Sequence, residues 1–301
     1  MDIWLSVVIG SHNASAVIEA CLAALAPQVS AQRMEVIVAD SSTDDTAERI
    51  RAGFPWVHLL HFEQPLSVPA LRGRGIEVAR GEIIALLDPY SVAAPDWAER
   101  MLHAHDGNDH LAIGGSVGLY RPESRSWGAW ALYFNEYGLF MPPVQQGETW
   151  IVPGSNVSYK RRALFDGARP RYPVFWKTFV SWEIERQGSP LWLAGDVRVD
   201  LNKPIAFSDF LRTRYDHGRC FAAQRVHESG RAARLWRAAS AMAVPPLLVW
   251  RWTRGFWPKR RHRLDYLLTL PAQFLLFTVW SWGEVCGYAR GTGGCCNRLY
   301  Y

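Results

Sequence analysis

Two aspartates lie where a folded chain could use them to bind a nucleotide. Asp40 follows the apolar run at residues 35–39, and Asp88 follows the run at residues 82–87. Such runs are typical of buried strands, and parallel sheets bind ligands beyond the carboxyl ends of their strands. An aspartate there can accept hydrogen bonds from a base N–H or a ribose hydroxyl, and Asp40 is the candidate for this role. The alternative is helix capping, because Asp40, Thr43 and Asp44 are also of the residue types that cap a helix start.

The elements that would position these aspartates alternate between strand and helix. Strands are predicted at residues 4–9, 35–39, 57–61 and 82–87, and helices at residues 14–25, 43–53 and 69–80. This order favours an α/β fold, Rossmann-like, with a mostly parallel sheet and helices on both faces. Residues 95–104 predict a further helix and residues 112–119 a further strand.

Composition and charge indicate a folded protein with a basic C-terminal part. The 301 residues are 49% hydrophobic and 20% charged, which excludes a disordered chain. Residues 1–210 carry 18 Lys and Arg against 24 Asp and Glu, a net charge of −6, whereas residues 211–301 carry 15 against 4, a net charge of +11. Basic, aromatic and apolar residues together favour contact with a membrane surface. Nucleic acid is not expected as a partner, because the segments between the basic residues are too apolar for a solvated groove.

Two apolar segments follow residue 210, at residues 238–250 and 266–283, and a loop with six basic residues separates them. As helices they would be about 20 Å and 27 Å long, against about 30 Å for the hydrocarbon core of a bilayer. We expect interfacial or re-entrant helices at the cytoplasmic face of a membrane, because basic loops stay on that side. The alternative is a pair of helices in an ordinary soluble core.

The cysteines and the N-terminus point to the cytosol. The five cysteines are scattered without paired spacing, which favours a reducing compartment and argues against a disulfide framework. The N-terminus has no basic region before its first apolar run, so no signal peptide is expected.

Three motifs in order resemble the family 2 glycosyltransferases, inverting enzymes of the GT-A fold. They are Ser6-Val-Val-Ile-Gly-Ser-His-Asn13, Glu35-Val-Ile-Val-Ala-Asp-Ser-Ser-Thr-Asp-Asp-Thr46 and Ala79-Arg-Gly-Glu-Ile-Ile-Ala-Leu-Leu-Asp88. The resemblance covers about residues 3–225. It implies a GT-A domain at residues 1–225 and membrane-associated C-terminal helices at residues 226–301, because residues 283–291 are also similar to the end of membrane-associated members.

The resemblance implies a donor site for a nucleotide sugar. Ser11 and Asn13 would line the nucleotide pocket with Asp40. Arg72 and Arg74 stand where the family has basic residues, and a guanidinium there could pair with a diphosphate. The alternative for these arginines is a solvated helix face.

The resemblance also implies a divalent metal, Mg²⁺ or Mn²⁺, held by an Asp-Xaa-Asp motif against the diphosphate. Here the motif reads Asp88-Pro89-Tyr90, so Asp88 is the metal candidate and a neutral tyrosine takes the third position. One carboxylate with the phosphates could hold the ion, or cationic side chains could replace it.

The acceptor side departs from the family pattern. The family has a Glu-Asp pair about twelve residues before a glycine, and counting back from Gly188 gives Trp176-Lys177. Glu183 and Glu136 are the remaining candidates for the general base, although an exposed helix carboxylate is more often only solvated. Asn156, in a segment that resembles the acceptor side, is a candidate acceptor contact.

A basic stretch at residues 212–222 resembles the segment that follows the family's catalytic core. Arg214, His217 and Arg219 could close over a diphosphate or contact anionic lipid headgroups, and the sequence leaves both alternatives open.

The sequence therefore predicts an inverting glycosyltransferase that moves a sugar from a nucleotide-diphosphate donor to a lipid-linked or envelope-glycan acceptor. The alternative is a catalytically degenerate GT-A scaffold that binds a nucleotide or a partner without turnover. A dinucleotide oxidoreductase is disfavoured, because Gly10-Ser-His-Asn13 lacks the three spaced glycines of that fingerprint.

Overall fold

The computed structural model describes residues 3–204, 206–227 and 229–299, which fold as two compact units. The first unit holds the described residues up to Tyr120 and those from Phe140 to Pro204. The second holds Arg121–Leu139 and the described residues from 206 to Leu299. Helix α8 (Phe207–Arg225) therefore groups with the C-terminal helices, whereas the family resemblance places it in the catalytic domain.

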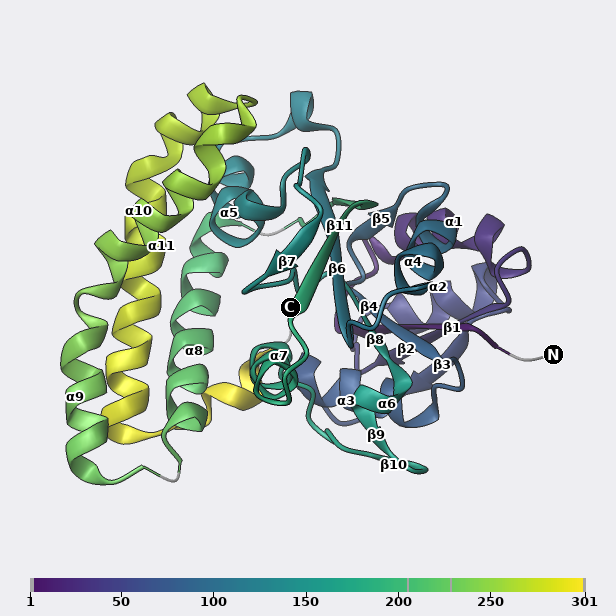
Figure 1. Cartoon of the computed structure of the whole chain (residues 1–301), viewed down its shortest axis with the longest axis horizontal. Helices are drawn as coiled ribbons and strands as arrows, with labels where there is room; N and C mark the ends of the chain where they lie inside the picture. The colour runs from purple at the N-terminus through teal and green to yellow at the C-terminus, as the bar shows by residue number, and fades with distance from the viewer. Residues whose placement is uncertain (1–2, 205, 228, 300–301) are drawn as a thin grey trace. The chain divides into compact units, whose positions relative to one another are not determined.

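The first unit is built on one mixed sheet (Figure 1). Four parallel strands lie side by side in the order β3-β2-β1-β4: β3 (His58–His61), β2 (Met34–Asp40), β1 (Leu5–Ser11) and β4 (Ile83–Leu87). The sheet continues through strands of both directions: β8 (Asn156–Lys160), β6 (Ala112–Leu119), β11 (Leu191–Leu201) and β5 (Ser91–Ala93), with β7 (Gly147–Thr149) also paired to β11. A separate two-stranded sheet is formed by β9 (Phe165–Asp166) and β10 (Arg169–Pro170).

Helices lie on both faces of this sheet, as the sequence predicts. They are α1 (Ile18–Val29), α2 (Thr46–Gly53), α3 (Val68–Val78), α4 (Trp97–His105), α6 (Arg161–Leu164) and α7 (Lys177–Arg186). The chain moves in one direction along the sheet from β1 to β3 and returns past β1 to reach β4. Because crossovers between parallel strands are right-handed, α1 and α2 cover one face and α3 covers the other. The mostly parallel α/β architecture is confirmed.

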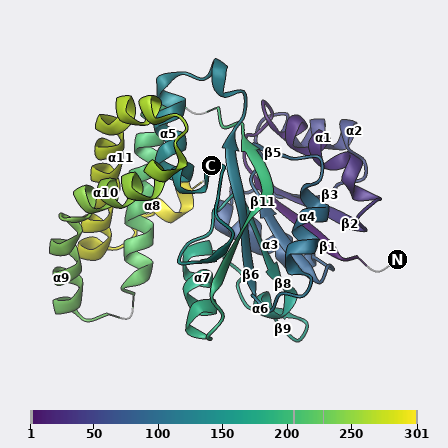
Figure 2. The same ribbon diagram turned by 45° about the horizontal axis from the view of Figure 1, so that its top comes forward.

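The second unit is helical (Figures 1 and 2). Its main helices are α5 (Trp127–Tyr137), α8, α9 (Arg231–Ala241), α10 (Val244–Phe256) and α11 (Arg263–Arg290). Four short 3₁₀ turns accompany the helices of the chain: η1 (Pro122–Ser124), η2 (Gly138–Phe140), η3 (Trp257–Lys259) and η4 (Cys295–Arg298). Helix α11 packs against the other four main helices, so it forms the centre of the unit.

Glycines allow α8 and α11 to approach each other closely. A Cβ atom at Gly283 of α11 would collide with the carbonyl oxygen of Tyr215, and one at Gly218 of α8 would collide with that of Trp280. Small residues at a helix crossing are needed where two backbones touch.

Among the described residues, none of the helices combines the length and the apolar character that crossing a membrane requires.

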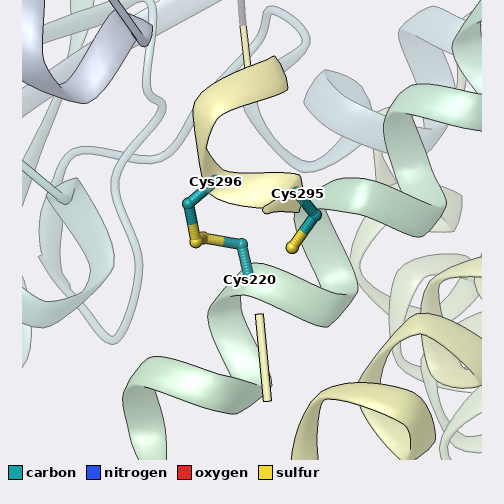
Figure 3. A group of neighbouring side chains, drawn as sticks. All are labelled: Cys220, Cys295 and Cys296. Atoms are coloured by element: carbon teal, nitrogen blue, oxygen red, sulfur yellow. A yellow bond between two sulfur atoms is a disulfide. The ribbon is translucent and has the colours of Figure 1, made fainter. Parts of the chain in front are cut away.

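A disulfide fastens the end of the chain to α8 and corrects the expectation from the cysteine spacing. Cys220 of α8 is bonded to Cys296 of η4, with the buried thiol of Cys295 beside them (Figure 3). The two bonded cysteines are 76 residues apart in the sequence. Only the packing of α11 alongside α8, in the same direction, brings them together, and spacing along the chain does not carry that information.

Candidate functional site

The predicted nucleotide-binding residues meet at one edge of the sheet. Strand β1 pairs with both β2 and β4, so that Ser11 lies opposite Asp40 and Ile9 lies opposite Leu87. The carboxyl ends of the three strands are therefore adjacent, and Asp88 follows directly after β4. The structure thus brings together Ser11, Asp40 and Asp88, as expected from the order of strands.

Asp40 is fully buried at this edge and holds neighbouring loops in place. Its Oδ1 accepts a hydrogen bond from Ser42 Oγ at 2.5 Å, and its Oδ2 lies 2.8 Å from Nδ1 of His61, the residue opposite it at the end of β3. Asp40 makes no capping bond to α2. Asp44 supports that helix start instead, because its Oδ1 accepts from the Thr46 backbone N–H at 3.1 Å.

Ser11 and Asn13 differ in how they contribute to this edge. Ser11 is buried, and within the described residues its hydroxyl has no hydrogen-bond partner. Asn13 is exposed and adopts a left-handed backbone conformation with φ of 49°. Its Oδ1 accepts from the Thr43 backbone N–H at 2.9 Å, and its own N–H donates to Ser42 Oγ at 2.7 Å. Asn13 therefore joins the loop after β1 to the loop after β2.

Asp88 and Arg72 form a buried ion pair. Arg72 Nη2 lies 2.6 Å from Asp88 Oδ1, and both side chains are largely shielded from solvent. The second oxygen, Oδ2, accepts from the Tyr90 hydroxyl at 3.0 Å. Burial and the nearby negative charge of Asp88 raise the pKa of the Cys21 thiol to about 12. The carboxyl group of Asp88 is thus held in place between a guanidinium and a phenol.

Two glycines that follow Arg72 in α3, Gly73 and Gly75, explain how the helix places it at the sheet edge. A Cβ at Gly75 would collide with Val8 of β1, and one at Gly73 would collide with the backbone of Pro173. Helix α3 therefore lies directly against β1 and the segment at residue 173. Arg74 points elsewhere, because two residues on a helix are about 200° apart. It is more than half exposed and pairs with Glu77 at 3.3 Å, so the solvated alternative holds for Arg74.

Asn156 does not have the exposed position expected of an acceptor contact. The side chain is fully buried in β8. Its Oδ1 accepts from Trp97 Nε1 at 2.9 Å, and its Nδ2 donates to the carbonyl oxygens of Ser116 and Val197, each at 2.9 Å. Both amide hydrogens are used, so Asn156 joins strands inside the sheet and does not reach an acceptor. The sequence position could not distinguish this internal role from a surface one.

The acid and base candidates of the acceptor side lie in different units. Glu183 on α7 is partly exposed and pairs with Arg186 at 2.7 Å. Lys177 begins the same helix, where the family pattern would place an acid, and its Nζ donates to the Val152 carbonyl oxygen at 2.6 Å. Glu136 belongs to α5 of the helical unit and lies 3.8 Å from Arg214.

The basic residues of α8 have internal contacts within the helical unit. The Arg214 guanidinium lies 4.3 Å from the centre of the Trp280 ring, and the His217 ring lies 5.0 Å from the same ring. Arg219 Nε donates to the Gly291 carbonyl oxygen at 3.0 Å. These contacts fasten α8 to α11 and to the segment after it. Contact with a diphosphate or with lipid headgroups stays a prediction for all three residues.

Comparison of the sequence with protein families gives one that includes these strand-end residues. The sequence profile of Glycosyl transferase family 2 matches residues 6–166, which is more than half of the chain. The chain belongs to glycosyl transferase family 2. The matched range includes Ser11, Asp40 and Asp88, the three residues that meet at the sheet edge.

Relatives and solved structures support the family and the fold. The chain is 24% identical over 145 residues to the glucosyl-dolichyl phosphate glucuronosyltransferase of Haloferax volcanii, covering 44% of each protein. It is 33% identical over 108 residues to the validoxylamine A glucosyltransferase of Streptomyces hygroscopicus, covering 34% of this chain and 26% of that one. The chain thus spans less than half the length of these curated relatives. A structure of GalNAc-T7 with UDP, GalNAc and Mn²⁺ shares the fold, with a TM-score of 0.52 and 15% identity over 68% of this chain and 44% of that one.

The sequence analysis did not identify three features of this sheet edge. They are His61, the contact of Tyr90 with Asp88, and Lys203. Lys203 follows β11 and is buried, with Nζ 5.2 Å from the centre of the Tyr90 ring. His61 could have been found, because it ends the predicted strand next to that of Asp40. Lys203 could not, because β11 joins the sheet more than 100 residues after β4.

Proposed function

We propose that this chain is an inverting glycosyltransferase that takes a sugar from a nucleotide-diphosphate donor. The observation that carries the proposal is the edge formed by Ser11, Asp40 and Asp88, with Arg72 fixed on Asp88. Asp40 would accept hydrogen bonds from the base or ribose, as acidic residues at strand ends do in other nucleotide folds. Ser11 would contribute its buried hydroxyl, and Arg72 would face the diphosphate.

The reaction would be a direct displacement at the anomeric carbon. A base takes the proton of the acceptor hydroxyl while the acceptor oxygen forms a bond to that carbon. The bond between the carbon and the diphosphate oxygen breaks, and its electron pair leaves with the diphosphate. Glu183 and Glu136 are the proposed bases, and a carboxylate that is solvated, as Glu183 is in part, is accessible to an acceptor.

The proposed acceptor is lipid-linked or a growing envelope glycan, at the cytoplasmic face of a membrane. Support comes from the relative named for glucosyl-dolichyl phosphate. It also comes from the helical unit, where many large apolar side chains are more than half exposed: Leu235, Trp236, Met242, Leu247, Trp250, Leu264, Leu268 and Trp282. Exposed arginines accompany them, and Arg254 lies 5.6 Å from the Trp250 ring centre. Tryptophan and arginine together suit an interface with anionic lipid.

Donor hydrolysis tests the transfer step without knowledge of the acceptor. Full-length protein is incubated with UDP-, GDP- and dTDP-sugars, and release of the nucleoside diphosphate is followed by chromatography. We expect slow release from one class of donor and a loss of about 100-fold in Asp88→Asn. The exposed acid Asp96 provides the matched control, and Asp96→Asn should retain the wild-type rate. Equal rates in Asp88→Asn and wild type would contradict the proposal.

A second candidate is a GT-A scaffold that binds a nucleotide without turnover. Lys177 favours it, because this lysine stands where the family has an acid and is bonded to the Val152 carbonyl oxygen. The same hydrolysis assay separates the two candidates when combined with a binding titration. Nucleotide binding without any release of nucleoside diphosphate would favour the scaffold, and release would exclude it.

A further inference from the structure

We propose that Arg72 and Lys203 neutralise the donor diphosphate in place of a divalent metal ion. The inference rests on the proposed function and deepens it, because it states which charges the donor site uses. It starts from the residues that surround Asp88, the carboxylate at the position where a metal ligand would stand.

Both oxygens of Asp88 are already engaged by other side chains. Oδ1 lies 2.6 Å from Arg72 Nη2, and Oδ2 accepts from the Tyr90 hydroxyl at 3.0 Å. The side chain is only 6% exposed. A hard cation such as Mg²⁺ or Mn²⁺ binds charged oxygens and usually takes one or two carboxylates from the protein. Coordination by Asp88 would require breaking one of these two buried contacts.

At the position where the family has a second acid, this chain has Tyr90, and a cation, Lys203, lies beside it. Its side chain is buried, and the Lys203 ammonium lies 5.2 Å from the centre of its ring. The backbone holds this arrangement, because the Asn202 N–H donates to the Tyr90 carbonyl oxygen at 2.8 Å. A neutral phenol is a poor metal ligand, since it ionises only near pH 10. The phenol ring instead offers its face to an ammonium group.

The surroundings supply no other set of metal ligands that includes Asp88. Across the described ranges, the only group of three or more His, Cys, Asp or Glu side chains close enough to share an ion is the cysteine trio of α8 and η4. Because both oxygens of Asp88 are engaged and residue 90 is a phenol, the residues at this edge do not fit a divalent ion held in the manner of an Asp-Xaa-Asp motif.

Charge and geometry suit direct recognition of phosphate. Asp88, Arg72 and Lys203 together carry one net positive charge. A guanidinium has five N–H donors in a planar fork, so one nitrogen can bond Asp88 while the group also pairs with phosphate oxygens. Asp88 fixes the direction of this fork before the donor binds. Fixed cations stabilise the negative charge that grows on the diphosphate as its bond to the sugar breaks.

Calorimetric titrations of full-length protein with UDP, GDP and dTDP test the inference, each in EDTA and in Mn²⁺. For the nucleotide that binds, we expect the two affinities to agree within about twofold. Arg72→Met should weaken binding about 10-fold to 100-fold in both buffers, as loss of a hydrogen bond to a charged group does. Arg74→Met, on the exposed side of the same helix, is the matched control and should bind like wild type.

Restoring the acid sharpens the test. Tyr90→Asp should bind the nucleotide at least about 10-fold more tightly with Mn²⁺ than with EDTA, because two carboxylates then face the ion. Tyr90→Phe should stay indifferent to Mn²⁺. The electron paramagnetic resonance signal of free Mn²⁺ gives an independent readout. Because the nucleotide binds Mn²⁺ by itself, the reference is a protein-free mixture of nucleotide and Mn²⁺, and we expect Tyr90→Asp, but not wild type, to decrease the signal below that reference.

The outcomes separate this inference from the proposed function. Wild-type binding that is lost in EDTA and restored by Mn²⁺ would overturn the inference and leave the proposed function standing. Absence of binding by all three nucleotides in both buffers would overturn the two together. Unchanged affinity in Arg72→Met would also overturn the inference, whatever the effect of metal.

Discussion

The charged side chains of the two units have opposite arrangements. In the first unit, the buried carboxylates Asp40 and Asp88 lie at strand ends, each beside one basic partner, His61 or Arg72. In the helical unit, Arg214 and Arg219 make internal contacts, with Glu136 of α5 and with Gly291 after α11, while Arg254 is exposed beside Trp250. The position of a charged residue at a strand end can therefore be predicted from the sequence. The surroundings of a charged residue on a helix follow only from how that helix packs.

The largest expected effect is a loss of stability in the helical unit. Gly283→Ala places a Cβ against the Tyr215 carbonyl oxygen and should destabilise the helical unit by about 3 kcal/mol or more. Gly230→Ala is the control, since a Cβ there meets no atom within 4 Å. Thermal unfolding followed by circular dichroism measures both. Equal melting temperatures for the two variants would show that α8 and α11 do not pack backbone to backbone.

Loss of the disulfide should weaken the same unit. Cys220→Ser removes a crosslink between residues 76 apart and should cost about 2–4 kcal/mol. Urea unfolding measures the change, with Cys286→Ser, which removes a free thiol, as the control. Reducing agent should lower the free energy of unfolding of wild type to that of Cys220→Ser. Indifference of wild type to reducing agent would contradict the crosslink.

Acid should destabilise the first unit through His105. Burial lowers the pKa of His105 to about 3, so the folded state keeps the ring neutral while the unfolded chain takes up a proton near pH 6.5. Stability is therefore lost as pH falls below 6.5, by about 2 kcal/mol at pH 5. Urea unfolding at pH 7 and pH 5 measures this loss, and His105→Gln should reduce it. Parallel pH profiles for wild type and variant would exclude His105 as the cause.

The smallest effect concerns the exposed arginines of the helical unit. Arg254→Gln should weaken binding to vesicles of phosphatidylcholine and phosphatidylserine about fivefold, because one basic residue near such a surface contributes about 1 kcal/mol. Co-sedimentation measures the bound fraction. Arg100→Gln in the first unit is the control and should leave it unchanged. Equal losses in both variants would mean that binding depends on total charge and not on this surface.

The sequence predicted that Asp40 and Asp88 meet at one edge of the sheet, because both follow strand ends. Asp40 and Asp88 each follow a continuous apolar run, and parallel strands bring such positions to one edge. Arg72 and Arg74 could not be separated by type, since only the packing of α3 against β1 decides which one faces the edge. Asn156 was misassigned because a buried amide and an exposed one look alike in sequence. The disulfide was missed because the pairing depends on how α11 packs alongside α8, which the cysteine spacing does not show.

The most direct test of the central claim is a calorimetric titration of UDP-, GDP- and dTDP-sugars into wild type and Asp40→Asn. Asp40 is the fully buried acceptor at the strand end, and its loss removes the charge that would hold the base or ribose. We predict that one donor binds wild type and that Asp40→Asn weakens this binding about 10-fold to 100-fold. Equal affinity of the two proteins for that donor would contradict a nucleotide site at this edge.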